Sequence, residues 1–193
     1  METNRFETFF DAIIAIVITV LVLKIPQPAS PTLSAFLDLK TMYVAYFISF
    51  LILYNLWYAN HNLFKLVDTI DNTTLWIYGA LTFVISLIPY FTIWLANNLY
   101  SVAAQTMFGV IFLVTHILNT LANRAIYRSN PYNKKLQEIN HTSYYFNLPA
   151  ILIVIGFVLT YTVYVPGIYY TCLISIILWI LIGRLVRRDD NGN

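Results

Sequence analysis

Six long apolar stretches, separated by short polar segments, dominate this chain of 193 residues. Each is close to the ~20 residues that a helix needs to cross a bilayer, and they cover 6–25, 41–64, 74–96, 101–123, 144–164 and 167–186. The runs are continuous rather than alternating, which favours helices over the strands of a barrel. Only 10% of the residues are charged, too few for a soluble surface, which usually carries ~25%. We therefore expect an all-α membrane protein with six transmembrane helices.

The basic residues indicate how these spans are oriented. With six spans, the side that holds both termini carries nine of the 11 Lys and Arg residues, and the opposite side carries Lys24 and Lys40. Because cytoplasmic loops are enriched in Lys and Arg, both termini are predicted to be cytoplasmic. The first run has no basic leader and no cleavage site, so we expect it to stay in the mature chain. Residues 1–187 are expected to form the transmembrane domain and 188–193 a disordered tail.

The first apolar run carries a periodic stripe. Ile16, Thr19, Val20 and Leu23 follow at i, i+3, i+4 and i+7, which places them on about one third of the helix circumference. Such a face could line a passage, although ordinary helix packing is the commoner explanation for an arbitrary membrane helix. Asp11 lies about 140° around the helix from Ile16. We expect Asp11 to point into protein and to find its partners on another helix.

The second span offers such partners near the same end. Trp57 and His61 are four residues apart, and Asp71 lies at the same level in the loop that follows. We infer a buried polar layer of Arg5, Asp11, His61 and Asp71, with Trp57 supplying packing and one donor. The alternative is that Arg5 and Asp71 are ordinary interfacial charges and Trp57 an interfacial aromatic residue. The residues alone favour neither interpretation.

Three segments of the chain carry a recognisable pattern: Arg5-Phe6-Glu7-Thr8-Phe9-Phe10-Asp11, Trp57-Tyr58-Ala59-Asn60-His61 and Leu87-Ile88-Pro89-Tyr90-Phe91-Thr92. They resemble the R-x-x-x-F-S-D, Trp-x-x-x-His and Leu-Pro-Phe-x-Thr motifs of the transmembrane protein 175 family of potassium channels. The three occur in the family's order and together span about half of the chain. Phe10 stands where the signature has serine, so any hydrogen bond that this serine makes is absent here.

The resemblance implies a homotetramer in the bilayer, with the four first helices lining a central pore for potassium ions. Ile16, Val20 and Leu23 are then expected to form apolar rings that constrict and gate the pore, and Thr19 a ring of hydroxyls near the passing ion. The chain contains no Thr-Val-Gly-Tyr-Gly filter, so side chains must line such a pore. The resemblance also favours the buried polar layer over ordinary interfacial residues.

The expected function is a potassium-selective or potassium-preferring passive channel in the cell membrane. No cofactor other than the permeant potassium ion and no nucleic-acid partner are expected. A proton-conducting channel of the same family is the nearest alternative, because His61 can titrate near neutral pH. A secondary transporter would usually show broken helices or repeats around a midplane site. An enzyme is disfavoured, because Cys172 and the histidines occupy different spans and form no nucleophile and base pair.

Two further features of the spans carry expectations. Pro89 and Pro149 are expected to kink the third and fifth spans, because proline removes a backbone donor within a helix. The fourth span has a polar edge that is expected to form hydrogen bonds between helices, made up of Thr115, His116, Asn119 and Asn123.

Overall fold

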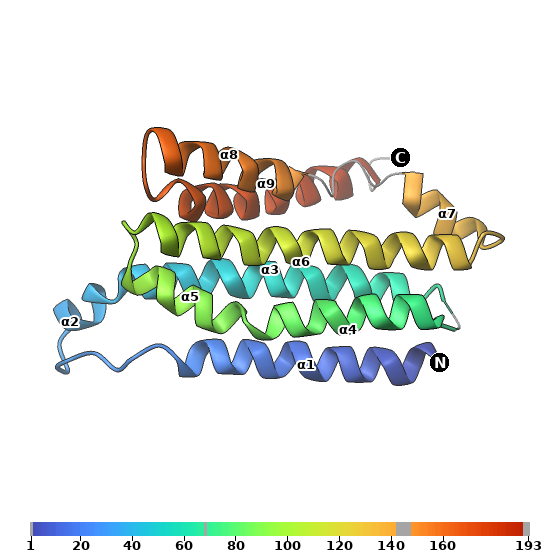
Figure 1. The fold of residues 1–193 in the computed structure, drawn as a ribbon, viewed down its shortest axis with the longest axis horizontal. Coiled ribbons are helices and arrows are strands. Elements are labelled where there is room, and N and C mark those ends of the chain that lie inside the picture. The colour runs from blue at the N-terminus through green and yellow to red at the C-terminus, as the bar shows by residue number, and fades with distance from the viewer. Residues whose placement is uncertain (1, 68, 142–147, 191–193) are drawn as a thin grey trace.

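The computed structural model describes residues 2–67, 69–141 and 148–190, with side chains described up to 137 and from 148 to 178. These residues form a bundle of long helices that lie alongside one another (Figure 1). In chain order the helices are α1 (Thr3–Leu23), α2 (Leu33–Asp38), α3 (Lys40–Phe64), α4 (Asn72–Ser86), α5 (Ile88–Asn97), α6 (Val102–Ser129), α7 (Lys134–His141), α8 (Leu148–Thr162) and α9 (Gly167–Asp190). The short helices α2 and α7 lie at opposite ends of the bundle, and α8 and α9 pack as a hairpin against α6.

The first four predicted spans are long helices in the structure. Within the described residues, four segments are long and apolar enough to cross a membrane: Thr3–Leu23, Lys40–Phe64, Asn72–Asn97 and Val102–Ser129. The apolar helices Leu148–Thr162 and Gly167–Leu178 are shorter, so six spans and cytoplasmic termini stay predictions. This part of the chain holds no β-strand beyond an isolated bridge between Glu2 and Thr69, which confirms the all-α class.

The chain end differs in one respect from the expected tail. Helix α9 runs to Asp190, two residues past the position at which the disordered tail is expected to begin. Residues 191–193 lie outside the described residues. The boundary between the transmembrane domain and the tail is therefore still an expectation.

The third span is broken at the predicted proline. Helix α4 ends at Ser86 and α5 begins at Ile88, with Pro89 in the first turn of α5. Proline fits a first turn, where its missing N–H is not needed, and it cannot continue a regular helix. Pro149 is the second described residue of α8 (Leu148–Thr162), and residues 142–147 before it lie outside the described residues. The kink expected at Pro149 therefore stays a prediction.

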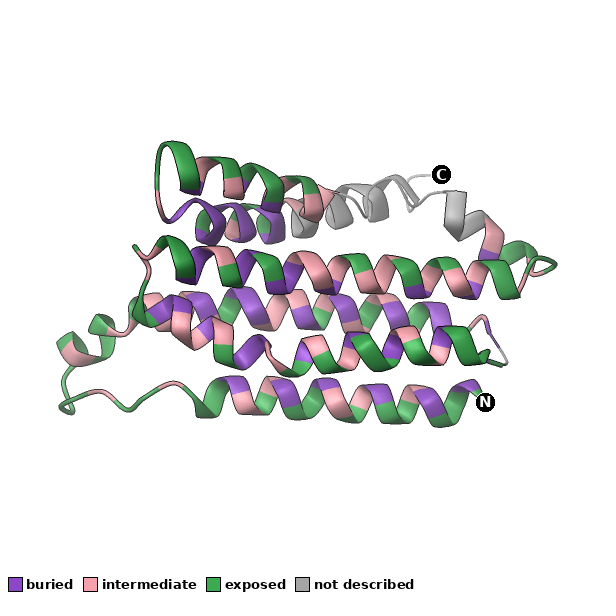
Figure 2. Cartoon of the chain, in the orientation of Figure 1, coloured by how far each residue is buried: buried purple, intermediate pink, exposed green. Residues whose placement is uncertain are grey.

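Buried and exposed residues alternate along helix α1 (Figure 2), so that one face of the helix is buried and the opposite face is exposed. Its buried side chains recur every three or four residues and pack against α3, α4 and α5. They are Thr3, Phe6, Phe10, Ile14, Val17 and Leu21. This spacing is that of a helix with a single apolar stripe in the core. The opposite face is left uncovered by the other described residues.

Two glycines allow α8 and α9 to approach each other closely. A Cβ atom on Gly156 would clash with the Thr171 hydroxyl oxygen and would lie 2.9 Å from Ile168 Cα. A Cβ atom on Gly167 would lie 2.9 Å from the carbonyl oxygen of Gly156. Backbone atoms cannot move aside without shifting the helices, so the hairpin depends on the missing side chains. Cys172 is buried in the same hairpin.

Asp71 caps the N-terminus of α4. Its carboxylate accepts hydrogen bonds from the backbone N–H groups of Thr73, at 3.2 Å, and Thr74, at 3.4 Å, and from the Thr74 hydroxyl. The bond from the Thr74 hydroxyl holds the pKa of Asp71 below its ordinary value of 3.8. Because the folded-state pKa is lowered, the stabilisation is complete above the ordinary pKa and is lost as the pH falls through the lowered value.

We expect Asp71→Ala to lower the free energy of unfolding by about 1 kcal/mol, because it leaves donors of the first helical turn without a partner. The measurement is the thermal-unfolding midpoint of the detergent-solubilised protein at neutral pH. Asp71→Asn keeps an acceptor and is the matched control, with a smaller loss expected. An unchanged midpoint for Asp71→Ala would show that the cap does not stabilise α4.

Candidate functional site

The four residues of the predicted stripe lie on the outward side of α1. Ile16 is 62% exposed and Leu23 is 76% exposed in the single chain. Thr19 is exposed as well, and Val20 is half-buried at the edge of the stripe. The Thr19 hydroxyl donates to the carbonyl oxygen of Ala15 at 2.8 Å, so its oxygen keeps free lone pairs. The structure thus places all four residues where another molecule can meet them.

The exposed face of α1 is longer than the predicted stripe. Phe9 is 54% exposed, and Ala12 is exposed between Phe9 and Ile16. Phe9, Ala12, Ile16, Thr19 and Leu23 follow one another at alternating spacings of three and four residues. This spacing is the one by which helices pack against one another along a single face. We call these five residues the α1 seam.

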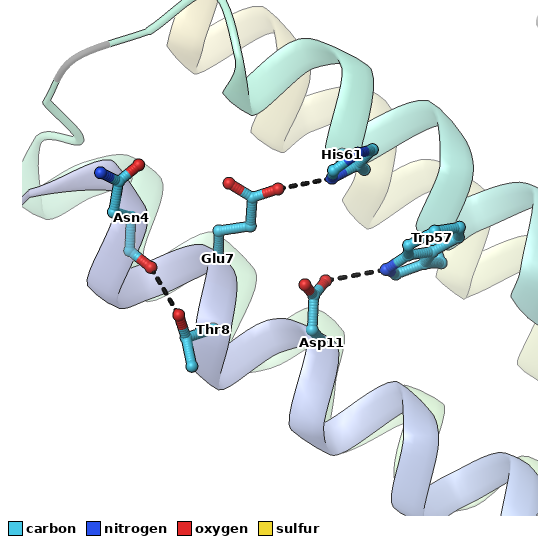
Figure 3. Close-up of polar contacts among 6 residues, drawn as sticks. All are labelled: Asn4, Glu7, Thr8, Asp11, Trp57 and His61. Carbon is cyan, nitrogen blue, oxygen red and sulfur yellow. Dashed lines mark hydrogen bonds and ion pairs between the residues drawn. The ribbon is translucent and has the colours of Figure 1, made fainter.

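A pair of polar contacts fastens the other side of α1 to α3 (Figure 3). Trp57 Nε1 donates to Asp11 Oδ1 at 2.8 Å, and His61 Nδ1 lies 2.6 Å from Glu7 Oε1. The rings of Trp57 and His61 stack with centroids 5.2 Å apart. We call Glu7, Asp11, Trp57 and His61 the α1–α3 clasp.

The geometry of the clasp follows from two matching spacings. Glu7 and Asp11 are four residues apart on α1, and Trp57 and His61 are four apart on α3. Side chains four apart lie on the same face of a helix. The two helices run in opposite directions (Figure 1). Glu7 therefore meets His61 one turn away from the point at which Asp11 meets Trp57.

The predicted polar layer differs from the clasp in two members. The structure brings Asp11, Trp57 and His61 together, but Asp71 bonds to the first turn of α4 instead. Arg5 is exposed and lies about 120° around α1 from Asp11, in line with the α1 seam. The prediction that Arg5 and Asp71 belong to the polar layer is therefore corrected. Glu7, which sequence reasoning missed, takes their place.

Phe10, the residue that departs from the family signature, closes an aromatic box. Its ring packs against Phe64, with centroids 6.0 Å apart, and against Tyr78, at 5.5 Å. Phe6 completes the box, at 5.1 Å from Tyr78. Phe10 is only 1% exposed. An apolar contact between α1, α3 and α4 therefore occupies the position at which the signature serine would stand.

A buried hydrogen-bond network lies next to this box. The Tyr78 hydroxyl donates to Asn60 Oδ1 at 2.6 Å, and Asn60 Nδ2 donates to Asn119 Oδ1 at 2.9 Å. Asn123 Oδ1 lies 3.4 Å from the same hydroxyl. Asn119 and Asn123 belong to the polar edge predicted for the fourth span, and their bonds between helices are confirmed. Tyr78 was not anticipated, because an isolated tyrosine in an apolar run has no distinguishing pattern.

We expect Tyr78→Phe to destabilise the protein by ~0.6–1.7 kcal/mol, the usual range for one hydrogen bond between membrane helices. The phenyl ring preserves the aromatic box, so the loss isolates the hydroxyl. Thermal unfolding in detergent measures it. Tyr90→Phe on the exposed face of α5 is the control, because Tyr90 is 67% exposed. Equal midpoints for both variants would contradict a stabilising network.

The chain is similar to known proteins in sequence and in fold. Residues 5–89 match the family described as endosomal/lysosomal potassium channel TMEM175. A potassium channel of Chryseobacterium sp. (strain P1-3) is 26% identical over 195 aligned residues, which cover 100% of both chains. A potassium channel of Chamaesiphon minutus is 31% identical over 134 residues, which cover 64% of this chain and 66% of that protein.

The fold has a counterpart among solved structures. The crystal structure of a lysosomal potassium-selective channel TMEM175 homolog from Chamaesiphon minutus matches it with a TM-score of 0.76 and 26% identity. The match covers 93% of this chain and 96% of that chain. The helical bundle and its relatives define a multi-span membrane protein of a non-enzymatic class.

The family model, the named potassium channels and the solved structure confirm that the chain resembles the TMEM175 family, as its motif segments predict. The R-x-x-x-F-S-D and Trp-x-x-x-His segments supply Asp11, Trp57 and His61 to the clasp. In the described part of the chain, no group of three His, Cys, Asp or Glu side chains could hold a metal ion. The absence of a cofactor stays a prediction.

Proposed function

We propose that this chain forms a potassium-selective or potassium-preferring channel, as a homotetramer whose four α1 helices line a central pore. The observation that carries the proposal is the exposed α1 seam on a helix whose opposite face is fastened to α3 and α4. A helix held in this way presents a fixed set of side chains to its neighbours. The named potassium channels among the relatives support the choice of ion.

The proposed pore has side chains rather than carbonyl groups along its wall. Ile16, Val20 and Leu23 of four copies would form apolar rings, which can gate an ion path by expelling water. Thr19 would supply four hydroxyl oxygens between these rings. Potassium sheds its hydration water at a lower cost than sodium does, so narrow apolar rings favour potassium. The preference is expected to be weaker than that of a carbonyl filter.

The orientation and location of the channel belong to the same proposal. The α1–α3 clasp lies at the end of the bundle at which α1 begins (Figure 1). The excess of Lys and Arg predicted for this end argues that it faces the cytoplasm. The bacterial relatives argue for a multi-pass protein of the cell membrane.

Purified protein in liposomes provides the direct test of this function. With a potassium gradient, the reversal potential should lie closer to the equilibrium potential of potassium than to that of sodium. The flux should not saturate or depend on a coupled ion. A reversal potential that follows the pH gradient would favour the proton channel instead. Flux that saturates and depends on a counter-ion would favour a transporter. Either result would overturn the proposed potassium channel.

A disulfide test addresses the four-fold arrangement. We expect Leu23→Cys to form covalent dimers on mild oxidation, because exposed Leu23 side chains of neighbouring copies would meet at the pore. Leu21→Cys is the control, since Leu21 is 0% exposed and faces the core of its own chain. The native background is low, because Cys172 is the single cysteine of the sequence and is buried. Non-reducing gel electrophoresis reads the result, and equal cross-linking of the two variants would contradict the arrangement.

A further inference from the structure

The short helix α2 has an apolar face that the other described residues leave largely exposed. Leu33 is 74% exposed, Phe36 is 48% exposed and Leu37 is 54% exposed. These three side chains lie within about 100° of one another around the helix axis. Ser34 and Asp38 lie together on the adjoining side. A helix of six residues with this division is amphipathic.

Helix α2 lies at the end of the bundle at which α1 ends and α3 begins (Figure 1). Thr32 caps it, with its hydroxyl oxygen accepting the backbone N–H of Ala35 at 3.3 Å. The ring of Phe36 stacks on Tyr43 of α3, with centroids 4.7 Å apart. One turn further along α3, Phe47 is 50% exposed. The apolar face of α2 therefore continues onto the outward side of a predicted membrane span.

Other exposed residues at this end are of the types that are common at a bilayer surface. Exposed tyrosines stand in or next to the neighbouring connections, with Tyr100 71% and Tyr164 47% exposed. Tyrosine is enriched at membrane interfaces, where its ring is apolar and its hydroxyl is hydrated. Lys24 and Lys40 are exposed at the end of α1 and the start of α3, and lysine side chains next to a membrane span can reach the headgroups. Helix α2 lies along the chain between these two lysines.

We propose that α2 lies in the membrane–water interface, with Leu33, Phe36 and Leu37 among the lipid acyl chains and Ser34 and Asp38 toward water. Amphipathic helices bind a lipid surface by burying such a face at the boundary between headgroups and acyl chains. A second copy of the chain is a poorer occupant. Stable protein interfaces bury ~800 Å² on each partner, far more than three side chains supply. The interfacial helix would anchor the segment that leaves α1 to the bilayer.

Spin labels on the two sides of α2 test this placement. In a Cys172→Ala background, Leu37→Cys and Ser34→Cys are labelled with a nitroxide and reconstituted in phosphatidylcholine and phosphatidylglycerol vesicles. Oxygen concentrates in the acyl region, and a nickel chelate stays in water. The ratio of oxygen to nickel accessibility is expected to be several-fold higher at Leu37→Cys than at Ser34→Cys. Leu33→Cys, on the same face, should repeat the result if Leu37→Cys fails to assemble.

Two outcomes would overturn the proposal. Equal nickel accessibility at both positions would place the apolar face in water. Shielding from both reagents, with spin–spin broadening between copies, would place a second subunit over it. A thermal-unfolding midpoint close to that of the unlabelled protein shows that the labelled protein is folded. Lipid contact at α2 is measured separately from ion flux. A result that contradicts the interfacial placement would therefore not contradict the proposed channel function.

Discussion

Replacing Ile16 by asparagine is expected to raise the potassium current several-fold and to reduce the discrimination against sodium. Ile16 is 62% exposed in the single chain, and the proposed tetramer would turn it into an apolar ring around the ion path. An amide side chain would hold water in that ring and remove its dewetting barrier. The measurement is the single-channel conductance and the shift in reversal potential when sodium replaces potassium.

Two controls separate this effect from a general membrane leak. Ile16→Val keeps the ring apolar, so its current should stay close to that of the unmodified protein. Ile117→Asn introduces the same amide on α6, at a position that is 46% exposed, and should not change selectivity. Unchanged currents for Ile16→Asn would remove Ile16 from the proposed gate.

The second large effect is expected for Asp11→Ala. This change leaves the indole N–H of Trp57 without its acceptor at 2.8 Å. Loss of a partly buried acceptor costs about 1–3 kcal/mol, which thermal unfolding in detergent would detect. Asp11→Asn keeps an oxygen that can accept the same proton, so most of the stability should remain. Because the clasp fixes the rotation of α1, Asp11→Ala should also alter ion selectivity.

A double-mutant cycle assigns this loss to the pair. If Asp11 and Trp57 act through one bond, Asp11→Ala together with Trp57→Phe should destabilise by less than the sum of the two single changes. Thr8→Ala is the control, because the Thr8 hydroxyl donates at 2.8 Å to the carbonyl of Asn4 within its own helix. Additive losses would contradict a direct contribution from the pair.

The sequence predicts most of the fold because each membrane helix corresponds to a long apolar run. Four of the predicted spans are present as long helices, and Pro89 marks the break between α4 and α5. Helix α2 escapes prediction, because six residues are too few for a periodic signal. The kink expected at Pro149 stays a prediction, because residues 142–147 lie outside the described part of the chain.

The sequence predicts the candidate site in part. The periodicity of one helix indicates which residues share a face, but not which helix packs against that face. The angle between Asp11 and Ile16 predicts correctly that Asp11 points away from the stripe, toward α3. Its bond to Trp57, and the pairing of His61 with Glu7 rather than Asp71, depend on the register between two antiparallel helices. Periodicity in one helix contains no information on that register. The equal spacing of four residues in the pair Glu7 and Asp11 and in the pair Trp57 and His61 is the sequence signal that indicates this register.

Because of the break at Leu87, α1 packs against two separate helices, α4 and α5. The half of α1 that carries the clasp lies beside α4, and the half that carries Thr19 and Leu23 lies beside α5 (Figure 1). Helix α5 is held to α3 by the buried contact of Ser49 and Thr92, at 2.8 Å. In the proposed tetramer, a tilt of α5 about Leu87 would move the half of α1 that carries Thr19 and Leu23, whereas the clasp would hold the other half against α3.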